Sequence, residues 1–514
     1  MKLKELDIEV EPLAGAMPAF RAATAPAELS EVCGWAHARR ARLVALWGSD
    51  ETRRGAGFAL HVALAFPSGL VWLTAPLDRT SPRYPGIADI YPAANRMQRA
   101  CADLLGIVPE EGADQRKWLR HGAWPEGTFP LRKDFDADAR HAQRPDRYPF
   151  VPVAGEGVHE IPVGPVHAGT IEPGHFRFSV VGEKILRLEE RLGYKHKGIE
   201  KLFESMTLEE GARLAGRVSG DSTVAYAWAY AMAVEGATGT EPPRRALGLR
   251  GILLELERIA NHLGDLGYLG NDVSLPFGFF QFWRLKETLL RLNARLFGHR
   301  YLMDLVVPGG VARDVQRAEA EQLLAQLETV RREVAVLQAI YDEHAGAQDR
   351  FIMTGQVLPE LAERMGLVGF AARASGIARD LRVDYPVPPY QQVDPRLISH
   401  TRGDVAARVS LRFEEVFESI RLIQALVEEL PPGAVRAPLA RPGPRAAGIG
   451  WIEGWRGEVL VALETDAGRI HRLHPHDPSW QNWPLLEHAV HGNIVPDFPL
   501  INKSFNLSYS GADL

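Results

Sequence analysis

The chain has 514 residues, of which 46% are hydrophobic and 24% are charged, a length and balance that predict two or three globular domains with a sizeable core. The net charge of −6 excludes nucleic acid as a general partner, because such binding needs a concentrated basic surface. Only Cys33 and Cys101 are cysteines, so one chain cannot supply four thiolates to a metal centre or to an all-cysteine iron–sulfur cluster.

The N-terminus carries no visible secretory signal, because acidic residues and prolines follow residues 1–5. The longest apolar run, residues 224–234, is too short to cross a bilayer, which takes about 20 helical residues. The few cysteines also fit a reducing cytoplasm. We therefore expect a cytoplasmic chain with no transmembrane segment of its own, attached to a membrane only through a partner.

The first 135 residues are expected to form a small α/β domain. Short apolar runs at residues 41–47, 58–66 and 70–73 are separated by glycine and proline, which is typical of strands. A helix is predicted over residues 93–105. Residues 136–158 are rich in Pro, Gly, Asp, Arg and His without periodicity, which indicates a linker to a larger domain over residues 159–514.

Two motifs lie in the small domain. Residues 84–95 read Tyr-Pro-Gly-Ile-Ala-Asp-Ile-Tyr-Pro-Ala-Ala-Asn, and residues 129–135 read Phe-Pro-Leu-Arg-Lys-Asp-Phe. They resemble the start of the main helix and the C-terminal signature of the thirty-kilodalton-type subunit of respiratory complex I. The resemblance implies the fold of that subunit for the small domain.

The larger domain opens with a polar loop over residues 164–178. It carries His167, Glu172 and His175 between glycines and prolines, so a rigid loop would offer an acid and groups that titrate near neutrality. The alternative is that both histidines only satisfy backbone groups beneath the loop. Further on, His196 and Glu200 are four residues apart, which predicts an ordinary ion pair or a helix cap more readily than a catalytic pair.

A helix-to-helix elbow is predicted at residues 216–222, Gly-Arg-Val-Ser-Gly-Asp-Ser. Upstream, Thr207 and Glu210 have the spacing of a capping box, so a helix starts there. Gly220 can adopt backbone angles that other residues resist, and Asp221 or Ser222 can cap a second helix.

Long amphipathic helices are predicted over residues 247–264, 282–296, 315–344 and 405–426, which together could form a bundle. The first of them places Glu255, Arg258 and His262 along one side. Such a network can position a proton path or lock helices together, and locking is the favoured interpretation.

The C-terminal part begins with a predicted hairpin, residues 457–463 and 469–473 around Asp-Ala-Gly at 466–468. A short helix is expected over residues 485–490, followed by an irregular tail. The fold class is thus α+β: a small N-terminal α/β domain followed by a large, mainly helical domain with small β elements.

The elbow and the tail resemble the metal-binding segments of nickel–iron hydrogenase large subunits. The elbow of that family reads Arg-Ile-Cys-Gly-x-Cys, and here Ser219 and Ser222 stand at the cysteine positions. The second cysteine pair of the family, Asp-Pro-Cys-x-x-Cys, matches Ser508 and Gly511. Serine is a hard, weakly basic ligand and glycine has no side chain, so these vestigial positions are not expected to bind a soft metal.

The polar loop resembles the first signature loop of energy-converting (group 4) hydrogenases and the Gly-Pro-x-His loop of the 49-kilodalton-type, quinone-site subunit of complex I. The resemblance implies that Glu172 passes protons, that His175 binds a quinone head group, and that His167 lies beside the same cavity. Asp221 would supply a further acid. No counterpart of the quinone-binding tyrosine of complex I can be placed in this sequence.

The resemblance covers nearly the whole chain, a complex I small-subunit-like domain fused to a hydrogenase-like large subunit, the order found in formate hydrogenlyase and hydrogenase-4 large subunits. It implies a peripheral subunit on the inner face of the cell membrane, with an iron–sulfur small subunit and membrane-arm subunits as partners. The iron–sulfur clusters are expected in that partner, with no metal or cofactor in this chain. The family is also associated with NAD and proton translocation, yet no glycine-rich phosphate loop supports nucleotide binding here.

Two mechanisms compete within this class. In one, the cavity binds a quinone-like acceptor and Glu172, His175 and Asp221 handle protons; in the other, the chain is a structural coupler of an ion-translocating complex. Hydrogenase activity is not expected in either. A third alternative is a metal-dependent enzyme with ligands among His167, Glu172, His175, Asp221 and His262.

Overall fold

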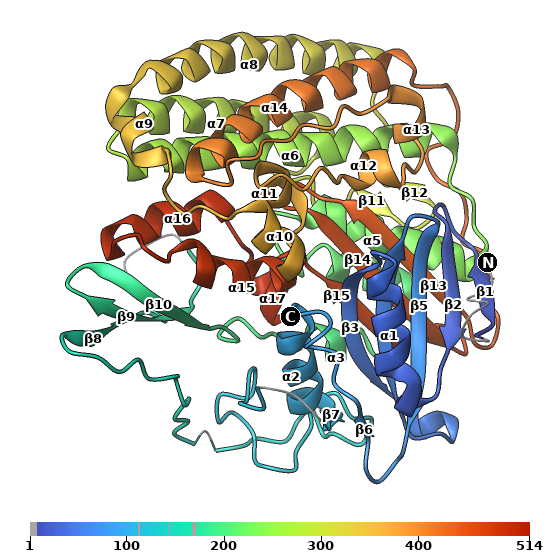
Figure 1. The fold of residues 1–514 in the computed structure, drawn as a ribbon. Helices are drawn as coiled ribbons and strands as arrows, with labels where there is room; N and C mark the ends of the chain where they lie inside the picture. The colour runs from blue at the N-terminus through green and yellow to red at the C-terminus, as the bar shows by residue number, and fades with distance from the viewer. Residues whose placement is uncertain (1–7, 111–113, 143, 167–170) are drawn as a thin grey trace.

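The computed structural model describes residues 8–110, 114–142, 144–166 and 171–514. Figure 1 shows a bundle of long helices at the top, two sheets below it on the right, and a separate three-stranded sheet at the lower left. The predicted α+β class is therefore confirmed.

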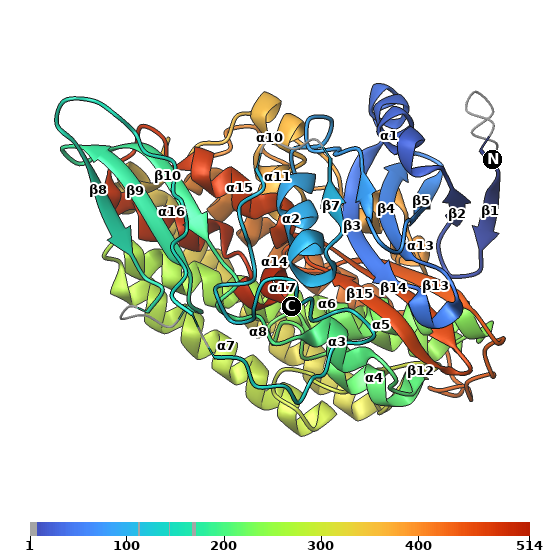
Figure 2. The ribbon, with the colours of Figure 1, turned by 90° about the horizontal axis from the view of Figure 1, so that it is seen from below.

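The N-terminal sheet has five strands in the order β1-β2-β5-β4-β3. Only β2 and β5 pair in parallel. The predicted strands are present, and α1 and α2 accompany the sheet, which Figure 2 shows from below. The bounds are β1 (Val10–Leu13), β2 (Ala19–Ala23), α1 (Leu29–Ala38), β3 (Arg42–Asp50), β4 (Phe58–Phe66), β5 (Gly69–Leu77), β6 (Arg83–Tyr84), α2 (Ala94–Leu105) and β7 (Val108–Pro109).

The segment that follows contains neither helix nor strand among its described residues, 114–142 and 144–157, as expected of a linker. The chain then forms an antiparallel sheet in the order β10-β9-β8. Its strands are β8 (Val158–Val163), β9 (His175–Val181) and β10 (Lys184–Arg191). The polar loop predicted as a site therefore connects β8 to β9.

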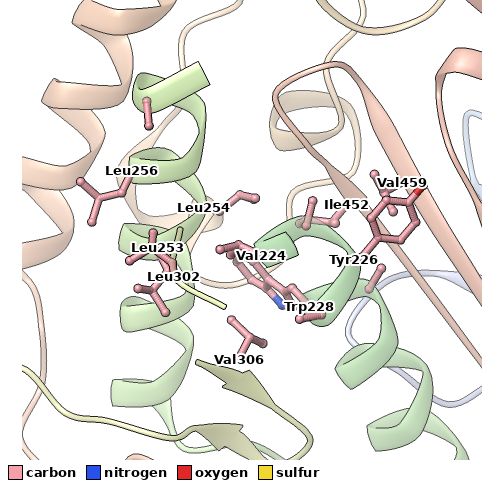
Figure 3. Packing of buried hydrophobic residues seen from close by; sticks show 14 of the residues in the cluster. Val224, Tyr226, Trp228, Leu253, Leu254, Leu256, Leu302, Val306, Ile452 and Val459 are labelled. Carbon is pink, nitrogen blue, oxygen red and sulfur yellow. The ribbon is translucent and has the colours of Figure 1, made fainter. Parts of the chain in front are cut away.

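Four long helices form the bundle: α6 (Arg244–Asp272), α7 (Pro276–Phe297), α8 (Arg317–Glu343) and α14 (Val405–Glu428). Each contains or nearly matches a helix predicted from apolar spacing. Figure 3 shows Leu253 and Leu254 of α6 facing Val224 and Trp228 of the next helix layer. Burial of these side chains removes apolar surface from water and fixes α6 at the centre of the molecule.

Helix α5 (Thr223–Thr238) lies across a sheet formed by β13 (Ala447–Glu453), β14 (Glu458–Asp466) and β15 (Arg469–His476). The close approach needs two glycines on β13. A Cβ atom added at Gly448 or Gly450 would lie 1.9 Å from the backbone oxygen of Ala233 or Ala229. The alanine-rich face of α5 and the glycines of β13 are thus two halves of one contact.

The elbow lies between α4 (Leu208–Ala215) and α5. The capping box of Thr207 and Glu210 is present, as predicted. Two expectations were wrong: Gly220 does not have a positive φ, and Ser222, although at the N-cap of α5, makes no capping hydrogen bond. Instead, the Glu257 carboxylate of α6 accepts from Val224 N at 2.7 Å and Ala225 N at 3.2 Å. A side chain distant in sequence therefore caps the helix.

The expected irregular tail was also wrong. It contains two short helices, α16 (Phe498–Phe505) and α17 (Tyr509–Asp513), beyond a longer α15 (Ser479–Ala489). The remaining elements are α3 (Ile199–Phe203), β11 (Val306–Val307), β12 (Gly310–Val311), α9 (Ala345–Phe351), α10 (Pro359–Met365), α11 (Gly369–Ala374), α12 (Leu381–Asp384) and α13 (Tyr390–Val393), with three short 3₁₀ turns.

The small N-terminal domain is fixed to the larger region by polar contacts. Arg42 of β3 pairs with Glu458 of β14 through both guanidinium nitrogens. Lys133, in the motif shared with complex I, donates to Glu204 Oε1 and to His471 O, both at 2.6 Å. That motif therefore serves as a clamp between the two regions.

We predict that Gly450→Ala lowers the free energy of unfolding by about 1–3 kcal/mol, because its Cβ would force α5 away from β13. Gly220→Ala is the matched control. An added Cβ there meets no atom within 4 Å, so its effect should stay within about 0.5 kcal/mol. Denaturant unfolding of both variants measures the difference, and equal effects would contradict this account of the α5–β13 contact.

Candidate functional site

The elbow and the C-terminal segment, nearly 290 residues apart in sequence, meet in the interior. Ser219 Oγ lies 2.9 Å from Ser508 Oγ, and both residues are buried. Ser508 caps α17 by accepting from Gly511 N at 2.9 Å. Ser222 is also buried and joins the group through a shared arginine. The four positions predicted from the hydrogenase resemblance are thus brought together.

The shared arginine is Arg456, in the turn between β13 and β14. Its guanidinium pairs with both carboxylate oxygens of Asp221, donates to Ser222 Oγ at 3.2 Å, and donates to Asn506 O of the C-terminal segment. It stacks on Trp455 at 4.0 Å. One cation therefore ties the elbow to the C-terminal segment.

Asp221 is held ionised in this arrangement. Burial opposes its ionisation, but the Arg456 guanidinium and the hydrogen bond from Ser219 outweigh burial and lower the pKa of the carboxyl. The Asp221 side chain is still 40% exposed. A charged acid thus stands at the mouth of the pocket.

Sequence reasoning missed Asp477, which borders the same pocket. Tyr226 donates to its Oδ2 at 2.7 Å, and Ser479 N donates to its Oδ1 at 2.8 Å. The side chain is buried, and burial raises the pKa of the carboxyl. No local motif marks this aspartate, which follows β15 directly.

A nickel–iron pair does not fit these residues. Three ligand positions carry hydroxyls, the fourth carries no side chain, and the Arg456 guanidinium already places a positive charge there. Among the described residues, no group of three or more His, Cys, Asp or Glu side chains could hold a metal ion. The donor set therefore gives no chemical basis for a metal at this position.

Glu172 lies on the other side of the C-terminal segment. Its Oε2 accepts from Ser510 N at 2.9 Å, and its Oε1 is 3.8 Å from Lys195 Nζ. The side chain is 38% exposed. Glu172 therefore stands beside the pocket and remains open to solvent.

His175, at the start of β9, is held away from the elbow. Among the described residues, its Nδ1 lies 3.1 Å from Gly164 O, and Arg177 Nε lies 3.4 Å from its Nε2. Burial lowers the pKa of the imidazole. His167 lies outside the described residues. The structure thus places Glu172 near the serines, and His175 satisfies the loop backbone.

His196 and Glu200 do not pair, so that expectation was wrong. His196 Nδ1 lies 2.8 Å from Asp513 O. The Glu200 carboxylate instead accepts from Arg472 at 2.6 Å and contacts His474 Nδ1 at 2.8 Å. Burial opposes its ionisation, but Arg472 and His474 outweigh burial and lower the pKa of Glu200 to about 2.

Glu255, Arg258 and His262 belong to a buried network that joins α6 to α14 and β13. Glu255 accepts from Ser419 Oγ and Tyr390 Oη, both at 2.6 Å, while His262 Nε2 lies 2.7 Å from Glu415 Oε2. The network continues through Arg373, Asp380, Arg382, Glu415 and Glu453. Its geometry matches the interpretation that these residues lock helices together.

No helix in the described ranges combines the length and apolarity that a membrane span requires. The fold and the pocket instead define the class of large, hydrogenase-like subunits. Residues 22–141 match the model of the respiratory-chain NADH dehydrogenase 30 Kd subunit, and residues 272–446 match that of the 49 Kd subunit.

Known proteins extend this similarity along most of the chain. Formate hydrogenlyase subunit 5 of Escherichia coli is 33% identical over 92% of this chain and 84% of its own length. Hydrogenase-4 component G of the same organism is 34% identical over 92% and 83%. The C/D-type NADH-quinone oxidoreductase subunit of Bacteroides thetaiotaomicron is 30% identical over 83% and 84%.

The chain belongs to the family that unites the large subunits of formate hydrogenlyase and hydrogenase-4 with the C/D-type subunit of NADH-quinone oxidoreductase. The fold agrees with a chain of the membrane-bound sulfane sulfur reductase, an archaeal respiratory membrane complex. That match has a TM-score of 0.66 at 23% identity and covers 71% of this chain and all of the other.

We predict that Glu200→Gln lowers the free energy of unfolding by about 3 kcal/mol near neutral pH, because Arg472 and His474 stabilise the carboxylate. A lowered pKa gives stability that is present above the unfolded value of 4.5 and is lost as pH falls toward about 2. The difference between wild type and variant should shrink over that interval. A difference that does not change with pH would contradict the assignment.

Proposed function

We propose that this chain is the large peripheral subunit of a membrane-bound, complex I-like oxidoreductase and that it acts there without a nickel–iron centre. The observation that carries the proposal is the Arg456 guanidinium, which bridges Asp221 and Ser222 of the elbow to Asn506 of the C-terminal segment. Family membership supports the kind of assembly, and the oxygen-only pocket supports the absence of the metal pair.

In this role the chain is a coupler. Electrons would pass through iron–sulfur clusters of a partner subunit, while this chain supplies a rigid arrangement of charges beside it. The buried network around Glu255 and Glu415 supports the role, because each of its charges is balanced by opposite charges and hydrogen bonds that cross from α6 to α14. Attachment to the inner face of the cell membrane would come through membrane-arm subunits.

A second candidate is a site for a quinone-like acceptor. The partial exposure of Glu172 and Asp221 favours it, because a reduced quinone must take up protons from nearby acids. His175 supports it less, since its ring is engaged by Gly164 and Arg177. The side chains that fill the space between the elbow and the tail favour the coupling role.

Glu172→Gln in the intact complex distinguishes the two candidates. Under the coupling role, turnover should change by less than about twofold, because the amide oxygen can still accept from Ser510 N. A loss of about 100-fold or more would contradict the coupling role and favour the acceptor site. The measurement is electron-transfer turnover of the purified complex.

Two further variants serve as controls in the same preparation. Glu183→Gln changes an exposed glutamate of the turn between β9 and β10 and should leave turnover unaffected. Asp221→Asn leaves the Arg456 guanidinium without its carboxylate and should reduce the amount of assembled complex. Normal assembly of Asp221→Asn would contradict the importance given to the ion pair.

A further inference from the structure

Gly511 stands at the position of the fourth metal ligand, and the space for its side chain is already occupied. A Cβ atom added there would lie 2.2 Å from Asp477 Oδ2 and 2.6 Å from Asp477 Cγ. Real Cβ atoms essentially never approach another heavy atom below 3.0 Å. The carboxylate therefore lies about where a thiolate of residue 511 would project.

Asp477 cannot easily move out of this space. Tyr226 Oη and Ser479 N hold its two oxygens at 2.7 and 2.8 Å, and the side chain is buried. Ser479 Oγ in turn accepts from Ser508 N at 2.9 Å, which ties the same turn to the C-terminal segment. Displacement of the carboxylate would leave buried polar groups unpaired.

The other three ligand positions differ from the fourth. Ser219, Ser222 and Ser508 already carry a Cβ and an oxygen that point into the pocket contacts. A cysteine at each of these positions would only replace oxygen by the larger sulfur. Only position 511 lacks room for any side chain.

We propose that Asp477, held by Tyr226, has taken the place of the fourth ligand, so that the pocket is closed to a four-thiolate metal centre even when all four cysteines are restored. The inference rests on the proposed metal-free function, and it names the residue outside the ligand set that makes the loss structural. The ligand class excluded is a soft divalent cation that seeks thiolates.

Cadmium binding to the full-length chain tests the proposal. The variant Ser219→Cys/Ser222→Cys/Ser508→Cys/Gly511→Cys is compared with the same variant carrying Asp477→Ala. We expect the five-site variant to show the sulfur-to-cadmium absorbance of four thiolates and to bind Cd²⁺ at least about tenfold more tightly than the four-site variant. Equal affinity and equal absorbance in the two variants would overturn the proposal.

A control isolates the contribution of Asp477 from general loosening of the pocket. Asp265→Ala removes another buried aspartate, which pairs with Arg412 at 2.9 Å and borders no ligand position. Added to the four-site variant, it should not increase Cd²⁺ affinity. An increase equal to that of Asp477→Ala would overturn the steric argument.

A second measurement needs no cysteine and no metal. Gly511→Ala should lower the melting temperature of the otherwise unchanged chain by several degrees, and should lower it much less in an Asp477→Ala background. Additive effects would show that the two positions do not compete for one space. Nickel in the native complex would refute the proposed function, whereas these comparisons test Asp477 alone.

Discussion

The pairing of the Arg456 guanidinium with the Asp221 carboxylate is the interaction on which the centre of this structure depends. A guanidinium that is nearly fully buried is costly unless its charge and its donors are satisfied. Here one carboxylate, one serine hydroxyl and one backbone oxygen satisfy it from three segments. The elbow, the β13–β14 turn and the C-terminal segment are therefore held in one arrangement by one side chain.

The rest of the interior is arranged so that this centre stays rigid. Helix α6 sends Glu257 to cap α5 and sends Glu255, Arg258 and His262 toward α14. The glycines of β13 let α5 lie close against the sheet that carries Arg456. Rigidity of this kind suits a subunit that keeps charges at fixed positions beside a partner's redox centre, because fixed dipoles and charges need no reorganisation when an electron arrives.

Local patterns were enough to predict much of the fold. Apolar alternation located β4, helical spacing located α6 and α14, and the capping box of Thr207 located α4. The short helices of the tail were missed because five to eight residues give too little periodicity to distinguish a helix from a loop. The cap of α5 was missed because Glu257 is 33 residues away from it.

The site could be predicted only in part. Family resemblance was needed to associate Ser219 with Ser508, since no local signal connects residues 289 positions apart. Arg456 and Asp477 escaped notice because each follows a strand in an ordinary turn, and their meaning depends on what the fold brings opposite them. Glu200 was noticed, but its partners come from β15, which spacing along the chain cannot reveal.

The central claim is that Arg456, Asp221 and three serines have replaced a metal pair. Elemental analysis of the native complex, isolated with its partner subunits, tests it most directly, because iron reports the clusters of the partner and nickel reports this pocket. The account predicts iron without stoichiometric nickel. Nickel in stoichiometric amount with this chain would contradict it.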